Sequence, residues 1–353
     1  MKDSTLFQWV KTLTELPGPT NYEEPVQEAL EGLWRPHVQS LRRDALGNLV
    51  AHWGGQGPRL LIGAHADEIC LLVKSIRPDG FIWPTRGTGG GELKAPDFTF
   101  VGQPVTLVGD RGPVPGLVTT VTGHIQTVAQ REKSRLDWKD IFIDIGALDR
   151  EEVLEQGIRP GTPVVFDVPT RQLGHHMVGK AMDDRAALAV MTALLTEIPV
   201  GELAYDVTLV STVQEEVGLV GAITAAAGDY DRGLALDVGL AGDIPLVGDE
   251  QFPGRLGGGP LLGYKDVGVH YDKRILAEFR EVAKATDIPV QPVVFLEYAS
   301  DGVAWIQHGL PTALLAFPTR YTHSPFEMIH EGDLHQLKTL IGAWLRRPAP
   351  KGI

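Results

Sequence analysis

The sequence predicts an α/β fold with a mixed central sheet flanked by helices, into which a small all-β domain is inserted. Short, largely apolar runs without alternation recur in both halves of the chain, as expected of strands that helices cover on both faces. Between about residues 75 and 168 the pattern changes to many short β-like runs separated by turn residues. We therefore assign residues 1–74 and 172–353 to one α/β domain and residues 75–171 to an inserted β-barrel-like domain.

Two helices are expected before the first buried strand. Apolar residues at helical spacing over residues 6–16 predict the first helix, which Pro17 ends. The second should cover about residues 23–34, with Pro25 tolerated in its first turn. The strands expected in this part of the chain are 38–42, 48–53 and 60–64.

The inserted domain should contain short strands and one short helix near residues 150–156. Its expected strands are 81–83, 105–108, 117–121, 141–145 and 164–166. After residue 172 the α/β pattern resumes, with helices expected from about Asp184, over 273–285 and over 334–345. The strands expected among these helices are 207–213, 233–236, 292–296 and 312–317.

Charge and cysteine content limit the possible partners and compartments. The formal net charge of -13 argues against nucleic acid or an anionic membrane as the main partner. Cys70 is the only cysteine, which excludes an internal disulfide and fits a reducing cytoplasm. It lies in an apolar run, so we expect a buried thiol rather than a nucleophile. No signal-peptide core and no apolar run near the ~20 residues of a membrane span are evident, and we expect a cytoplasmic protein.

Side chains that can bind a metal ion occur at five places where a strand or a tight loop is expected to end. Four of these places directly or nearly follow the predicted apolar strands. Ligands bind beyond the carboxyl ends of the strands in such sheets, so the groups converge on one rim if the strands share a direction. The groups are His65 with Asp67, Asp183 with Asp184, Glu215 with Glu216, Asp237, and His323.

This set of two histidines and several carboxylates suits zinc, cobalt or manganese. Three carboxylates, Asp183, Glu216 and Asp237, are a charge count compatible with two divalent ions. Two such ions about 3.5 to 4 Å apart can share a carboxylate and activate one water. Asp184 and Arg185 could form a salt bridge that steadies the loop presenting Asp183.

The adjacent residues Glu215 and Glu216 should point apart, so that one can bind a metal while the other faces the cavity as a proton acceptor. Asp67 follows His65 by two residues and is placed to hold the second nitrogen of its ring. Each group also has an ordinary structural explanation, such as a solvated Glu pair, a helix cap or a turn residue. Their joint occurrence at strand ends favours a common site.

Five motifs, which together cover about residues 17–340 in the order of the family, resemble those of the tetrahedral aminopeptidases. This family is also called the glutamyl or deblocking aminopeptidase family and belongs to the co-catalytic zinc exopeptidases. The stretch 298–302 departs from a Gly-Gly-Thr-Asp-Ala-like sequence near the substrate pocket of that family, so the resemblance identifies no substrate-binding residue. The motifs are Ala64-His65-Ala66-Asp67-Glu68, Gly179-Lys180-Ala181-Met182-Asp183-Asp184-Arg185, Val213-Gln214-Glu215-Glu216-Val217-Gly218, Ala235-Leu236-Asp237-Val238, and Pro318-Thr319-Arg320-Tyr321-Thr322-His323-Ser324-Pro325.

The resemblance implies a role for each candidate residue. Asp183 would bridge two ions, Glu215 would be the general base and acid, and Asp67 would orient His65. The remaining implied metal ligands are His65 with Asp237 on one ion and Glu216 with His323 on the other.

The resemblance also implies an activity and an assembly. The protein would be a metal-dependent aminopeptidase that removes N-terminal residues from peptides, with two zinc ions, or else cobalt or manganese, activating water. The alternatives are another hydrolase on the same site, an N-acyl-amino-acid deacylase or a polysaccharide hydrolase, and a catalytically silent scaffold. Against a scaffold stand Glu215 and the full ligand set. The inserted domain would drive dimerisation, so a homo-oligomer is expected, either a dimer or a hollow dodecamer.

Overall fold

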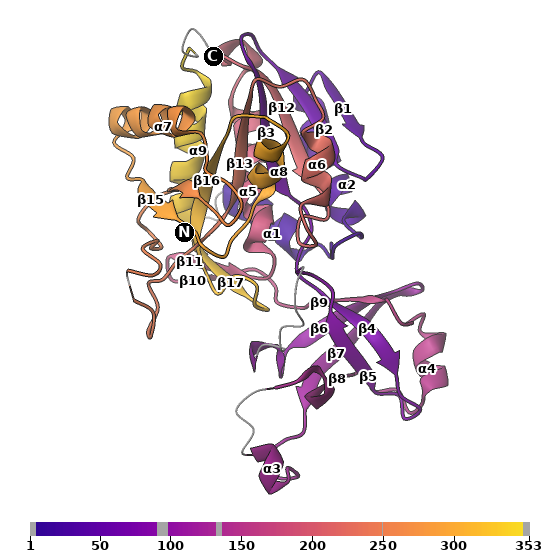
Figure 1. The fold of residues 1–353 in the computed structure, drawn as a ribbon. Coiled ribbons are helices and arrows are strands. Elements are labelled where there is room, and N and C mark those ends of the chain that lie inside the picture. Colours follow the sequence, from indigo (N-terminus) through magenta and orange to yellow (C-terminus); the bar gives the residue numbers. More distant parts are fainter. Residues whose placement is uncertain (1–4, 90–97, 132–135, 249, 349–353) are drawn as a thin grey trace.

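The computed structural model describes residues 5–89, 98–131, 136–248 and 250–348. Its strands form an 11-stranded sheet that helices cover, and a separate closed barrel that projects from it (Figure 1). The predicted α/β fold with a mixed sheet and an inserted all-β part is thereby confirmed. Across the described residues, no helix is long and apolar enough to cross a membrane.

The core of the large sheet is a set of parallel strands. These are β12 (Asp206–Thr212), β3 (Arg59–His65), β13 (Arg232–Leu240) and β16 (Thr312–Arg320), adjacent in this order. These four strands correspond to the predicted apolar runs 207–213, 60–64, 233–236 and 312–317. Because they are parallel, their carboxyl ends lie at the same edge of the sheet. The prediction that Asp237 follows its strand was wrong, because β13 continues beyond it to Leu240.

Antiparallel strands extend the sheet on both sides, so it is mixed. On one side lie β2 (Leu49–Gly54) and β1 (Ser40–Arg43). On the other side lie β17 (Glu327–His330), β11 (His176–Gly179) and β10 (Arg171–Leu173), while β14 (Leu261–Lys265) and β15 (Gln291–Val294) branch from β16. The strands β10, β11, β14 and β17 were not predicted.

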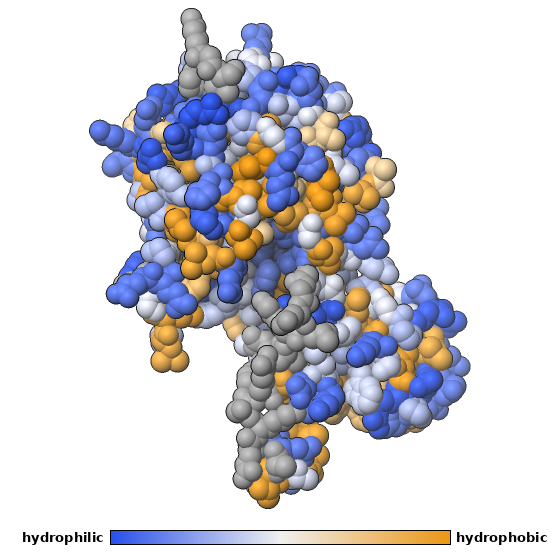
Figure 2. Space-filling model, in the orientation of Figure 1, coloured by the Kyte–Doolittle hydropathy of each residue, from blue (hydrophilic) through white to orange (hydrophobic). Residues whose placement is uncertain are grey.

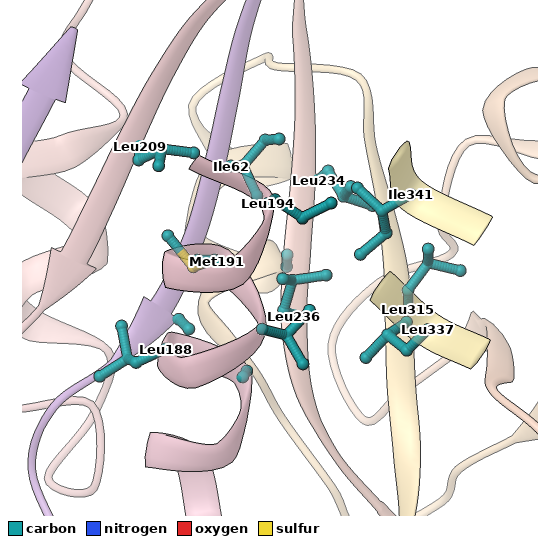
Figure 3. Close-up of a cluster of buried hydrophobic side chains, with 14 of the residues drawn as sticks. Ile62, Leu188, Met191, Leu194, Leu209, Leu234, Leu236, Leu315, Leu337 and Ile341 are labelled. Carbon is teal, nitrogen blue, oxygen red and sulfur yellow. The ribbon is translucent and has the colours of Figure 1, made fainter. Parts of the chain in front are cut away.

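Helix α5 (Met182–Glu197) is the central helix of the α/β part of the chain. It is apolar on almost every side and therefore buried, between α1 (Thr5–Glu15) and α9 (Glu331–Leu345) and against β3 and β13. Figure 3 shows its Leu188, Met191 and Leu194 among side chains of the strands and of α9. The same half contains α2 (Glu24–Trp34) and α7 (Lys273–Thr286).

Two short helices that the sequence did not reveal, α6 (Val220–Ala225) and α8 (Asp301–Gln307), pack against each other. Trp305 of α8 lies directly on the strands, because a Cβ at Gly63 would come within 2.8 Å of its ring and one at Gly233 within 3.0 Å. Glycine at these two strand positions thus lets the helix approach the sheet. In Figure 2 apolar side chains gather on the surface over α6 and α8, and Ile223 of α6 is among the exposed ones.

The barrel has its own apolar core and the strand order β4-β5-β8-β7-β6-β9. Asp149 caps its helix α4 (Arg150–Glu155) by accepting the backbone N–H of Glu152. The barrel starts at Leu71, before residue 75; the division of the chain at 75 and 171 stays a prediction. Its strands are β4 (Leu71–Ile76), β5 (Ile82–Arg86), β6 (Pro104–Gly109), β7 (Gly112–Thr120), β8 (Ile141–Asp144) and β9 (Pro163–Phe166), and a short helix α3 covers Val128–Arg131. Cys70, just before β4, is buried as expected.

Candidate metal centre

The structure brings all the predicted site residues to one rim of the large sheet. The parallel strands β3, β12, β13 and β16 end there together, and the N-terminal end of α5 faces them. His65 ends β3, Glu215 and Glu216 follow β12, Asp237 lies in β13, His323 follows β16, and Asp183 lies in the first turn of α5.

Two groups of side chains could each hold a metal ion, and Asp183 belongs to both. In each group the potential ligand atoms all lie within 4.8 Å of one another. Oδ1 of Asp183 is 2.9 Å from Nε2 of His65, whereas Oδ2 is 3.5 Å from Nε2 of His323. The two carboxylate oxygens thus face different histidines, as a bridging ligand requires. The groups are His65, Asp183 and Asp237, and Asp183, Glu216 and His323.

The centre contains more buried negative charge than its two histidines can neutralise. Burial and the charge of Asp183 hold the pKa of Asp237 well above its usual range. Burial raises the pKa of Glu216 to about 7, although the charge of His323 opposes the shift. Burial also opposes ionisation of Asp183, but hydrogen bonds from His323 and His65 outweigh it and lower its pKa. Like charges held together out of water are relieved either by protonation or by a bound cation.

A second observation also fits a bound cation. Oε1 of Glu216 is buried and has no hydrogen-bond partner within the described part of the chain. Oε2 of the same carboxylate lies 3.4 Å from Nε2 of His323. Imidazole nitrogens with carboxylate oxygens form the mixed donor set that zinc, cobalt and manganese accept. His323 is the most open member of the centre, since 52% of its side chain is exposed.

Asp67 connects two segments of the centre. Its Oδ1 lies 3.4 Å from Nδ1 of His65, which also lies 3.2 Å from the Asp67 carbonyl oxygen. The same carboxylate accepts the backbone N–H groups of Glu215 and Glu216 at 3.0 and 3.2 Å, and the Thr20 hydroxyl at 2.8 Å. The fully buried side chain of Asp67 therefore fixes both the orientation of the His65 ring and the position of the main chain that carries Glu215 and Glu216.

The neighbouring glutamates lie beside different histidines. Oε2 of Glu215 is 4.0 Å from Nε2 of His65, whereas Glu216 faces His323. Burial and the charges of Asp237 and Glu216 hold the pKa of Glu215 well above its usual range, against the opposing charge of His65. A carboxylate that holds a proton readily, next to a potential ion site, has the properties of a general base and acid.

Sequence reasoning missed two residues that shape the centre, Thr322 and Glu327. Buried Glu327 accepts the backbone N–H of Asp183 at 2.9 Å and that of His323 at 3.2 Å. The Thr322 hydroxyl lies 2.9 Å from Oε1 of Glu327 and 3.1 Å from Oδ2 of Asp183. Burial raises the pKa of Glu327 to about 8, as does Asp183. The available signal was a carboxylate four residues after His323, at the start of an otherwise weakly polar strand.

The predicted salt bridge between Asp184 and Arg185 is wrong. The Arg185 guanidinium, 0% exposed, instead pairs with Glu68 at 3.1 Å, and Lys180 pairs with the same carboxylate at 2.7 Å. Arg185 also donates to the carbonyls of Leu13, Gly18 and Ala66. Both carboxylate oxygens of Asp184 are buried with no hydrogen-bond partner among the described residues. The segment that carries Asp183 is thus held by the long-range ion pairs of Lys180 and Arg185 with Glu68, and not by a salt bridge between sequence neighbours.

We expect Glu68→Gln to destabilise the protein by about 3 to 5 kcal/mol, because it leaves the Lys180 and Arg185 charges buried without a countercharge. Urea unfolding at fixed zinc concentration measures the change. Glu28→Gln, on the exposed face of α2, is the matched control and should shift the free energy of unfolding by less than about 0.5 kcal/mol. Equal stabilities of the two variants would contradict the role of this cluster.

Comparisons with known proteins agree over nearly the whole chain. A family model described as M42 glutamyl aminopeptidase matches residues 47–340. The lysyl aminopeptidase of Pyrococcus furiosus is 31% identical over 350 residues, which are 98% of each chain. An aminopeptidase structure from Desulfurococcus kamchatkensis superposes with a TM-score of 0.91 at 31% identity, covering 99% of this chain and 98% of that one. The TET1 peptidase of Pyrococcus horikoshii, described as assembling into a tetrahedron or a large octahedral shell, has a TM-score of 0.85 at 30% identity, with 97% and 99% covered.

Proposed function

This chain belongs to the M42 glutamyl aminopeptidase family and is a metal-dependent aminopeptidase, and we propose that it cleaves the first residue from peptides at two divalent ions on the rim of the large sheet. The observation that carries this proposal is the position of Asp183, whose two carboxylate oxygens face different histidines. A single carboxylate between two ligand groups is the geometry of a two-ion site rather than of two independent sites.

The proposed ligands follow the two groups that share Asp183. One ion would be held by His65, Asp183 and Asp237, and the other by Asp183, Glu216 and His323, whose ligand atoms are within reach of a single ion. The excess of buried carboxylate charge supports this assignment. Zinc suits the mixed nitrogen and oxygen donors, and cobalt or manganese could replace it.

Such ions, when bound, polarise the scissile carbonyl and lower the pKa of the attacking water. We assign the proton transfers to Glu215, whose carboxylate lies beside the first group at 4.0 Å from the His65 ring. It accepts a proton as the water oxygen attacks the carbonyl carbon, and donates that proton to the amine nitrogen as the C–N bond breaks. Asp67 acts through its neighbours, by holding His65 and the Glu215 main chain in a constant relation.

Substrate and metal dependence test the function in one experiment. The purified protein is treated with a chelator, returned to zinc, cobalt or manganese, and assayed with aminoacyl-p-nitroanilides and with N-acetylated amino acids. Chelation should abolish hydrolysis of the nitroanilides and a divalent ion should restore it, because the ions supply the activated water. Hydrolysis of the acetylated compounds alone would instead identify an N-acyl-amino-acid deacylase, and activity that persists after chelation would contradict both assignments.

We also propose that the protein is a homo-oligomer built from dimers, in which the barrel joins two chains, with a dodecamer as the largest form. The similar TET1 peptidase is described as assembling into a tetrahedron or a large octahedral shell. The apolar area over α6 and α8 in Figure 2 supports further contacts. Light scattering coupled to size-exclusion chromatography should give a mass that is a multiple of the dimer. A mass of 38.3 kDa, that of one chain, would contradict the proposal.

A further inference from the structure

The barrel places an arginine beside the candidate metal centre. Arg86 is the last residue of β5 and is half-buried. Together with Glu216 and His323 it lines a small cavity between the barrel and the rim of the large sheet. Within the described part of the chain, no hydrogen bond or ion pair engages its guanidinium group.

Local backbone contacts hold Arg86 at this place. The N–H of Gly87 donates to the Cys70 carbonyl at 2.9 Å, and the N–H of Gly89 donates to the Glu216 carbonyl at 2.6 Å. The guanidinium packs against Gly89, where a Cβ would come within 3.2 Å of Nη1 and where φ is +82°. Arg86 is therefore positioned by the same main chain that carries Glu216.

Two other arginines of the barrel pair with a carboxylate. Arg77 pairs with Asp79 at 2.8 Å and Arg159 pairs with Asp110 at 2.7 Å. Both side chains are exposed, whereas Arg86 is half-buried. The half-buried Arg86 guanidinium offers five N–H donors to a molecule that enters the cavity, and none of its nitrogens is buried without a partner. Its best complement is a carboxylate, which two parallel N–H groups can bind together. Because no described residue pairs with Arg86, a carboxylate of a bound molecule can displace water from this guanidinium.

We propose that Arg86 binds a carboxylate on the residue that follows the cleaved bond, so that the enzyme prefers dipeptides with a free C-terminus or peptides with an acidic second residue. This inference rests on the proposed function. Two ion ligands and Arg86 share one small cavity, and one extended residue spans only about 3.3 to 3.6 Å. A carboxylate that contacts Arg86 while the scissile carbonyl lies at the ions is therefore expected on a residue beside that bond, and we assign it to the residue after the bond.

The test compares substrates that differ only in one charge. A dipeptide and its amide report on the C-terminal carboxylate, and dipeptide amides with Glu or Gln in second place report on the side chain. Both series begin with the residue that the wild type removes fastest from a p-nitroanilide. In at least one series, Arg86→Ala should lower the ratio of kcat/KM for the charged substrate over its neutral partner by about 10- to 100-fold, chiefly through KM. Arg86→Lys should restore part of the ratio, because it keeps the charge but not the paired donors.

Arg111→Ala is the matched control, because Arg111 is an exposed barrel arginine that donates to the Glu155 carbonyl. It should leave both ratios unchanged. Unchanged ratios in Arg86→Ala, equal losses for charged and neutral substrates, or a loss confined to glutamyl-p-nitroanilide would each overturn the assignment to the second residue. Failure of the proposed function is distinguishable, because the wild type would then cleave no neutral substrate at all. Thermal melting of each variant excludes misfolding as the cause of a loss.

Discussion

Replacing Glu215 with glutamine is expected to lower kcat by about 10²- to 10⁴-fold, the usual contribution of a positioned general base and acid. Glutamine has nearly the same shape but cannot accept and return a proton. The side chain belongs to neither group of potential metal ligands, so two ions per chain should remain bound. Steady-state kinetics, together with elemental analysis of the dialysed protein, measure both quantities.

The exposed variant Glu28→Gln again serves as the control and should keep wild-type kcat. Loss of metal together with activity in Glu215→Gln would move Glu215 from proton transfer to ion binding. Full activity in that variant would remove it from the mechanism. Because the hydrogen bond from the Glu215 backbone N–H to Asp67 does not depend on the side chain, the loop itself should keep its position.

Asp183→Asn is expected to remove both ions and to leave no measurable turnover. Asp183 is the one member common to the two ligand groups, and an Asn side chain offers one neutral oxygen and an NH₂ group that donates rather than binds a cation. The affinity for each ion should fall by more than the about 10- to 100-fold loss that is typical when a residue hydrogen-bonded to a metal ligand is replaced. Elemental analysis should find fewer than one ion per chain after dialysis.

Thermal stability gives an independent measure of the same change. A zinc ion that binds only the folded chain stabilises that state by about 2.7 kcal/mol when the free zinc concentration is 100 times the Kd of the site. The wild type should therefore melt at a higher temperature with zinc than with a chelator, whereas Asp183→Asn should melt at nearly the same temperature in both. His323→Ala, which affects one group only, should lose one ion and keep part of the zinc effect. Two ions in dialysed Asp183→Asn would contradict the bridging role.

Much of this fold could be predicted because each main feature has a local cause. The runs that became β3, β12, β13 and β16 are apolar without alternation, since helices cover both of their faces. The barrel was recognisable because its strands are short and separated by turn residues. The elements that were missed, such as α8 with seven residues, are too short to show a period above the noise of composition.

The sequence allowed us to predict which residues could bind a metal, but not which distant side chains hold those residues in place. Metal-binding residues at strand ends need only the identity of the residues and a common strand direction, which the sheet has. Glu327 was missed because its partner Asp183 lies 144 positions away in the chain. The wrong pairing of Arg185 with Asp184 came from preferring a sequence neighbour, whereas its actual partner Glu68 is 117 positions away. No spacing rule reaches over such distances.

The sequence by itself determined the class of the fold, the order of its elements and the residue types at the strand ends, because propensity, periodicity and ligand chemistry are properties of short segments. Only the tertiary structure decided which carboxylate Lys180 and Arg185 meet, that Asp67 also holds the main chain of Glu215 and Glu216, and that Arg86 of the barrel lines a cavity beside the centre. Those choices depend on which distant surfaces exclude water together, and burial is what makes an unpaired charge costly enough to select its partner.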